Sequence, residues 1–258
     1  MRPCPASARS NATQLGFSLV EMTIALAVLG IVLTGLIGPL QQFTNHQRQR
    51  DTREALASIR QALLGFAMSQ GRLPCPADPA KPISLASAGL AEPDDGSACL
   101  RQVGSLPWKT LGVSSTDAWF RRYTYAVAAR YSQAITVLAY PLPSSASDLA
   151  APAWYVYLSA QTPPPANPAQ LDRVAALVVS HGANGHGAWH HDGVQQDSAQ
   201  ASSQELLNLA SAGRTLGSNA SPLPFYLPAR PGADSDDVQD SLPAPLVLHA
   251  LVSAGRLP

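Results

Sequence analysis

The amino-acid sequence predicts an α+β protein, in which a long N-terminal helix packs on a small antiparallel β-sheet with long loops. Two observations lead to this fold class. An apolar run over residues 17–40 continues into residues 41–70, where apolar side chains repeat at helical spacing: Leu56, Ile59, Leu63 and Phe66. Several short β-rich segments then follow one another without intervening helices, which is typical of an antiparallel sheet.

The run over residues 17–40 has the composition of a membrane-spanning helix, with Glu21 as its one charged side chain. A helix over this range would reach about 36 Å at about 1.5 Å per residue, which exceeds a hydrocarbon core of roughly 30 Å. A carboxylate inside a bilayer costs at least ~2.5–3.5 kcal/mol. We therefore expect a cation on a neighbouring chain, at the same depth, to pair with Glu21.

The stretch Gly16-Phe17-Ser18-Leu19-Val20-Glu21, followed by the apolar run, resembles the N-terminal signal of type IV prepilins and type II secretion pseudopilins. This resemblance implies a pilin-like fold, cleavage by a prepilin peptidase after Gly16 and N-methylation of Phe17. It also implies that Glu21 neutralises the new α-amine of an adjacent subunit during assembly. The alternatives are an ordinary secretory signal peptide, whose apolar core would be shorter, and a signal anchor with a chance Glu.

The resemblance divides the chain into a leader over residues 1–16, a transmembrane helix over 17–40, an amphipathic continuation over 41–70 and a periplasmic globular domain over 71–258. It implies a single-pass inner-membrane protein that contacts lipid and other pilin or pseudopilin subunits and assembles into a pilus or pseudopilus. Arginine counts do not favour a cytoplasmic N-terminus, because Arg2 and Arg9 precede the run and four arginines follow it within residues 48–60. The expected orientation therefore comes from the resemblance.

Two short motifs of the globular domain resemble the same family. Residues 117–125 are similar to its Asp-x-Trp-Gly-x-x-Tyr-x-Tyr segment, with Phe120 where the family has Gly, so the turn there is expected to differ. Residues 180–185 are similar to its Ser-x-Gly-x-Asp-Gly turn, with Asn184 in place of Asp. The local patterns predict a C-terminal helix over 245–254 and strands over 122–127, 134–140, 154–158 and 174–180.

Cleavage of the leader would remove Cys4 and leave Cys75 and Cys99 as an even pair. A periplasmic domain permits a disulfide between them. Closing a loop of about two dozen residues would contribute on the order of 3 kcal/mol. Prolines on both sides of Cys75 predict an extended, exposed segment. The alternative is two free, buried thiols.

Acidic and imidazole side chains in the second half of the domain define two candidate metal sites. Four histidines lie within eleven residues, with Asp192 adjacent: His181, His186, His190 and His191. Imidazole and carboxylate ligands suit Zn²⁺, although this spacing matches no strong zinc pattern. Asp192, Asp236 and Asp237 are candidate ligands for Ca²⁺, which takes six to eight oxygen ligands and which some pseudopilins hold in this region. The alternative for both is a solvated loop, so we expect no cofactor and keep Ca²⁺ as an option.

Charged residues make up only 13% of the chain and the formal net charge is +0, which gives no basic patch for nucleic acid. Ser180-His181-Gly182 does not form the Gly-x-Ser-x-Gly elbow of a hydrolase, and we expect no enzyme. The sequence therefore predicts a structural subunit, a minor pilin or pseudopilin, of a type II secretion pseudopilus or a type IV pilus. The alternatives are a pilus-displayed adhesin or binding module, with residues 186–242 as its surface, and a membrane-anchored periplasmic metal-binding protein.

Overall fold

The computed structural model describes residues 18–133, 154–157, 171–201, 205, 224–226 and 236–257. Among these, side chains are described except for residues 33–42, 154–157, 171–173 and 224–226. The chain forms two compact units, Met1–Asn45 and His46–Pro258. The expected leader, residues 1–16, lies outside the described residues.

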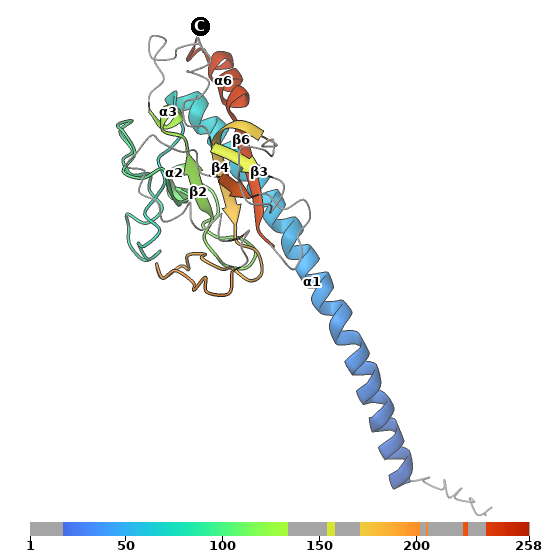
Figure 1. The fold of residues 1–258 in the computed structure, drawn as a ribbon. Coiled ribbons are helices and arrows are strands. Elements are labelled where there is room, and N and C mark those ends of the chain that lie inside the picture. The colour runs from blue at the N-terminus through green and yellow to red at the C-terminus, as the bar shows by residue number, and fades with distance from the viewer. Residues whose placement is uncertain are drawn as a thin grey trace, which may run out of the picture. The chain divides into compact units, whose positions relative to one another are not determined.

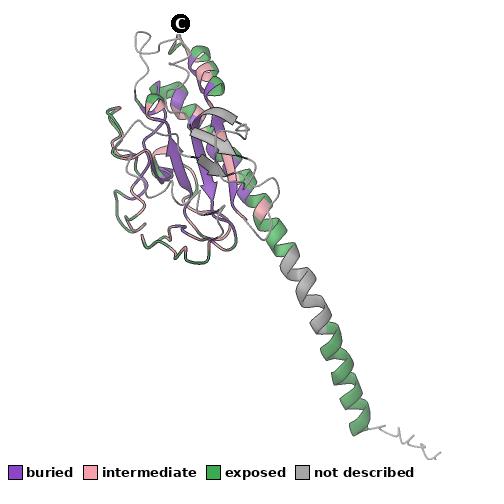
Figure 2. Cartoon of the chain, in the orientation of Figure 1, coloured by how far each residue is buried: buried purple, intermediate pink, exposed green. Residues whose placement is uncertain are grey.

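Helix α1 spans Leu19–Gln70 and confirms the long N-terminal helix, apart from Phe17, which lies outside the described residues. In the first unit, every described side chain over residues 18–32 is exposed, including the large apolar ones (Figure 2). Glu21 lies in the first turn of α1. A negative charge is favoured there by the partial positive charge at a helix N-terminus.

None of the helices among the described residues is long and apolar enough to cross a membrane. The span expected over residues 17–40 is therefore not confirmed and stays a prediction. Phe17 and the side chains of residues 33–40 lie outside the description.

In the second unit, one stripe of side chains along α1 is buried. Its most buried members recur every three or four positions and so share one helix face: Thr52, Leu56, Ile59, Leu63 and Ala67. Phe66, which the sequence pattern placed in this stripe, is only half-buried, and the Arg72 guanidinium lies 5.5 Å from its ring centroid. The helix stops at Gly71, which adopts a φ of +73° and donates its backbone N–H to the Ala67 carbonyl.

Six short strands of the described residues form one sheet (Figure 1). They are β1 (Val103–Ser105), β2 (Thr124–Val127), β3 (Trp154–Tyr157), β4 (Leu171–Ser180), β5 (Pro224–Tyr226) and β6 (Val238–Pro243). Their order is β1-β2-β4-β3-β5, and β6 also pairs with β4. The pairs are antiparallel, as expected, except that β5 is parallel to β3. The strand expected over residues 134–140 lies outside the description.

Strand β4 links the other strands because it pairs along both of its edges. Its residues 176–179 pair with β2, and its residues 174–180 pair with β6, so β2 and β6 lie on opposite edges. Three short helices complete the described elements of this unit: α2 (Trp108–Leu111), α3 (Ala129–Ser132) and α6 (Ala244–Ser253). The last confirms the helix expected over residues 245–254 to within one residue at each end.

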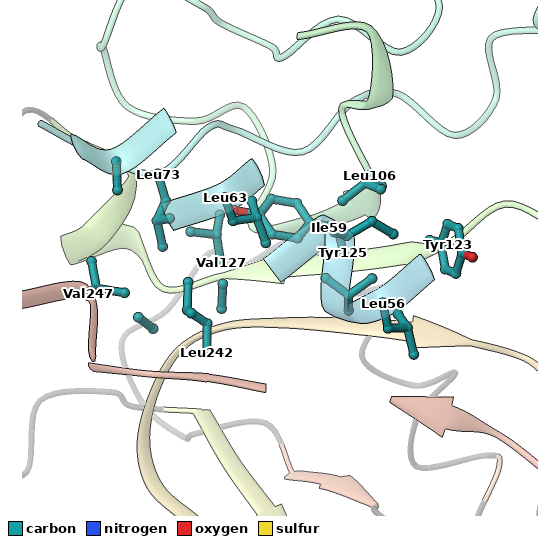
Figure 3. Packing of buried hydrophobic residues seen from close by; sticks show 14 of the residues in the cluster. Leu56, Ile59, Leu63, Leu73, Leu106, Tyr123, Tyr125, Val127, Leu242 and Val247 are labelled. Atoms are coloured by element: carbon teal, nitrogen blue, oxygen red, sulfur yellow. The ribbon is translucent and has the colours of Figure 1, made fainter. Parts of the chain in front are cut away.

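The main apolar core lies where the stripe of α1 meets one face of the sheet (Figure 3). Each of its central members is at most 2% exposed: Leu56, Ile59, Leu63, Tyr125, Val127, Leu242 and Val247. Alternate residues of β2 and β4 belong to a second cluster, which includes Ala126, Leu177 and Val179. Full burial of a large apolar side chain contributes about 1.5–3 kcal/mol, so this contact is the largest apolar contribution to the second unit.

The expected disulfide joins Cys75 to Cys99 and closes the loop between α1 and β1. The segment around Cys75 is extended, but the expectation that it is exposed is wrong, since Leu73, Cys75 and Ala77 are each 0% exposed. The reason is tertiary pairing that prolines do not reveal. Ala77 exchanges backbone hydrogen bonds with Ser105, and the Tyr125 hydroxyl donates to the Pro74 carbonyl at 3.1 Å.

Charged side chains hold the loop that the disulfide closes. Glu92 accepts hydrogen bonds from both Lys81 and Arg101, the latter at 3.2 Å. Arg101 also lies 3.5 Å from Asp78, and Arg72 lies 3.7 Å from Asp94. A loop without sequence periodicity is therefore fixed by side chains that are far apart along the chain.

Removing the disulfide should lower the free energy of unfolding. We expect the Cys75→Ala, Cys99→Ala double variant to lose about 3 kcal/mol, because the unfolded chain regains the entropy of an open loop. Urea unfolding of the full chain in detergent micelles measures the change. Cys4→Ala is the matched control and should leave the unfolding midpoint unchanged. An unaltered midpoint in the double variant would contradict a stabilising role for the disulfide.

Candidate functional site

The residues expected to act in processing lie at the N-terminus. Gly16 and Phe17 are outside the described residues. Glu21 is exposed on α1, and within the described part of the chain it forms no ion pair. Its carboxylate is thus available to a group outside this chain.

A second group of polar residues surrounds the turn that follows β4. Gly182 and Gly185 adopt φ values of +58° and +64°. A Cβ atom on Gly182 would collide with Asp236, and one on Gly185 would collide with the Arg121 guanidinium. Glycine at these positions therefore lets two segments distant in sequence approach the turn closely.

His181 is buried inside this turn and is 1% exposed. Its Nε2 atom lies 2.8 Å from the Thr124 hydroxyl, and its Nδ1 atom lies 4.0 Å from an Asp237 carboxylate oxygen. Burial, reinforced by the charge of Arg121, lowers the pKa of His181 to about 4. The imidazole is therefore neutral at neutral pH.

Asp117 holds the neighbouring turn of residues 117–121. One oxygen of its carboxylate accepts hydrogen bonds from the backbone N–H groups of Trp119 and Arg121, both at 2.9 Å. The other accepts a hydrogen bond from the Ser180 hydroxyl at 2.6 Å. Burial raises the pKa of Asp117, and these hydrogen bonds oppose the rise. The two motifs that resemble the pilin family thus meet at the Asp117–Ser180 contact.

Phe120 lies at the tip of this turn and differs from the family motif, which has Gly here. It adopts a φ of +63°, and it is the one non-glycine residue of the described chain with a positive φ. Its side chain is 76% exposed. The turn therefore keeps a backbone conformation suited to glycine, at a steric cost of about 1–2 kcal/mol for a side chain with a Cβ.

Three carboxylates come together beside the turn after β4. Within the described residues, Glu205, Asp236 and Asp237 form the only group of three or more potential metal ligands, with ligand atoms within 4.8 Å of one another. Burial raises the pKa of Asp236. We call these three residues the carboxylate cluster. The sequence identified Asp236 and Asp237 as candidate ligands, whereas it did not single out Glu205 as one.

The other metal candidates do not lie within the carboxylate cluster. The Nδ1 atom of His186 lies 3.3 Å from the Asp197 carbonyl. His190 donates its backbone N–H to Val194, and exposed Asp192 accepts the N–H of the same residue at 3.0 Å. The contacts of His190 and Asp192 with Val194 close a local turn. Within the described residues, His186, His190 and Asp192 do not come together as a group of three potential metal ligands.

Ca²⁺ takes six to eight oxygen ligands, of which the carboxylate cluster would supply those of three carboxylates. The nearby carbonyl oxygens already accept hydrogen bonds: that of Gly182 from Arg121, and that of Asn184 from Gln196 at 2.7 Å. One oxygen of Asp236 accepts the Asn184 backbone N–H at 2.8 Å. The cluster itself contains no imidazole or thiolate, and the His181 Nδ1 atom lies 4.0 Å from Asp237.

Comparison with known proteins bears on the N-terminus. Residues 11–37 match the family model of the prokaryotic N-terminal methylation motif, the signature of prepilin-type cleavage and methylation. The matched range includes Gly16, Phe17 and Glu21. No curated protein and no solved structure matches the chain. The chain thus carries the prepilin-type signature, and its α+β architecture fits a pilin-like fold.

Replacing Phe120 should reveal the cost of its backbone conformation. We expect Phe120→Gly to be more stable than Phe120→Ala by about 1 kcal/mol, because only glycine adopts a positive φ without a Cβ clash. The Ala variant is the matched control, since both substitutions remove the exposed ring. Urea unfolding in detergent measures the difference. Equal stability of the two variants would show that residue 120 is not held in this conformation.

His181 should make the fold sensitive to acid. Its pKa of about 4 in the folded chain lies below the ordinary value of 6.5, so between these values the unfolded chain binds more protons. The free energy of unfolding should fall by on the order of 3 kcal/mol as the pH drops from 6.5 to 4. Comparison with His181→Gln isolates this effect, because Asp117 and Asp236, whose raised pKa values act in the opposite direction, are present in both. Parallel stability curves would contradict a buried neutral imidazole.

Proposed function

We propose that this chain is a structural subunit, a minor pilin or pseudopilin, of a type II secretion pseudopilus or a type IV pilus. The match of residues 11–37 to the N-terminal methylation motif carries this proposal. The fold supports it, because α1 packs on a sheet in the second unit while its described side chains over residues 18–32 are exposed. The motif points to an assembling subunit rather than to an enzyme.

In this proposal, a prepilin peptidase cuts after Gly16, and Phe17 becomes the methylated first residue. The apolar run anchors the chain in the inner membrane as a single span, and the second unit is periplasmic. The Cys75–Cys99 disulfide supports that location, since disulfides persist in oxidising compartments such as the periplasm.

Assembly transfers the apolar part of α1 from lipid into a bundle of helices from other subunits. Lipid and leucine side chains are equally apolar, so apolar contact alone gives little preference for one register. Glu21 supplies that preference, because a carboxylate without a partner is costly in an apolar bundle. Its partner is the α-amine that cleavage creates on a neighbouring subunit.

Processing and assembly can be separated experimentally. Intact mass of the chain purified from membranes should show loss of residues 1–16 and one added methyl group, both in the wild type and in Glu21→Ala. Glu21→Ala should enter sheared filaments at least about tenfold less, since a loss of 1.4 kcal/mol already changes an equilibrium tenfold.

Glu54→Ala is the matched control, because Glu54 is an exposed glutamate elsewhere on α1. It should be processed and incorporated normally. A full-length mass in the wild type would refute prepilin processing. Normal incorporation of Glu21→Ala would refute the pairing of Glu21 with an amine.

A further inference from the structure

The carboxylate cluster concentrates negative charge in a largely buried place. Glu205 and Asp237 are 4% and 3% exposed, and Asp236 has one buried oxygen without a hydrogen-bond partner in the described chain. Carboxylates so close together repel one another and lose hydration. They remain ionised only where hydrogen-bond donors or positive charge compensate them. The neighbouring residues therefore decide whether this cluster needs a cation.

Asn184 supplies two of the donors. Its backbone N–H points at Asp236, and its side-chain Nδ2 lies 2.5 Å from Glu205 Oε1. The orientation of the amide follows from its surroundings, because Oδ1 accepts the backbone N–H of His186 at 3.1 Å. A reversed amide would place an oxygen against the Glu205 carboxylate and an NH₂ group against an N–H donor. Asn184 is therefore fixed as a donor to the cluster.

Arg121 supplies the positive charge. Its guanidinium fills the space left by the absent side chain of Gly185 and donates to the Gly182 carbonyl. Gly182, whose carbonyl accepts this hydrogen bond, lies directly against Asp236, so the guanidinium is held close to the cluster. Arginine retains its charge at all relevant pH values and presents several N–H groups in one plane. It thus places a fixed positive charge at the turn beside the cluster and donates to a carbonyl oxygen of that turn.

We propose that Arg121 and Asn184 take the place of a bound cation. Asn184 is the residue that keeps the carboxylate cluster from binding a divalent cation. An aspartate at position 184 would place a fourth carboxylate where Nδ2 now donates. It would then face Glu205 without an intervening hydrogen, and a divalent cation between the two would relieve the repulsion. Asn184 is thus a specificity-determining residue for calcium.

The test uses the full chain in detergent with Ca²⁺ alone as the probe. The wild type should melt at the same temperature in calcium chloride and in EGTA. Asn184→Asp should melt lower than the wild type in EGTA. At a Ca²⁺ concentration about a hundredfold above its dissociation constant, its Tm should rise by roughly 5–10 °C. Titration calorimetry should give binding heat for this variant and none for the wild type.

Two controls separate calcium binding from general effects of substitution. Asn45→Asp adds the same charge at an exposed position of α1 and should show no response to Ca²⁺. Asn184→Ala removes the amide without adding a carboxylate, so it should lose stability and gain no response.

Either of two results would overturn the proposal: a wild-type Tm that falls in EGTA, or an Asn184→Asp variant that ignores Ca²⁺. Should Asn184→Asp fail to fold under both conditions, titration calorimetry of the wild type with Ca²⁺ carries the test. Binding heat in the wild type would refute the proposal.

Discussion

The packing of one face of α1 against the sheet is the contact on which the second unit depends. The stripe from Thr52 to Ala67 belongs to the same buried layer as side chains of β2, β4, β6 and α6. Other features attach to the end of this helix, where backbone carbonyls lack helical partners. Arg256 donates to the carbonyls of Met68 and Ser69, and the disulfide-bonded Cys75 follows four residues after Gly71. The C-terminal segment and the disulfide loop are therefore both fixed to the end of α1.

The loops depend on a different kind of contact, of which Arg122 is the clearest case. Its side chain donates to the carbonyls of Pro79 at 2.9 Å and His191 at 2.8 Å, and it lies 5.1 Å from the centroid of a Trp108 ring. One buried guanidinium thus joins two loop segments and helix α2, which a lysine could not do because it lacks a planar set of donors. A domain rich in proline and poor in regular structure gains order from such long-range hydrogen bonds.

These two kinds of contact explain what could be predicted from the sequence. Helical and alternating periodicity reflect burial of a face, so α1, β2, β4 and α6 followed from local patterns. The burial of Cys75 did not, because it results from pairing of Ala77 with Ser105 across the sheet edge. The parallel pairing of β5 and the approach of Glu205 to Asp236 likewise join segments whose spacing carries no local signal. The sequence marked Phe120 and Asn184 only as departures from family motifs, and their consequences required the surrounding atoms.

Phe120 and Asn184 also show why the loops of such a chain can change while its framework is kept. Neither residue belongs to the buried cluster that contains the stripe of α1. The turn at Phe120 is held by the Asp117 carboxylate, and the turn at Asn184 is held by glycines and by Arg121. A substitution at either tip therefore alters exposed surface or local charge without altering the helix–sheet contact. In the assembly proposed above, the chemistry of the loops is then free to differ between subunits of one filament.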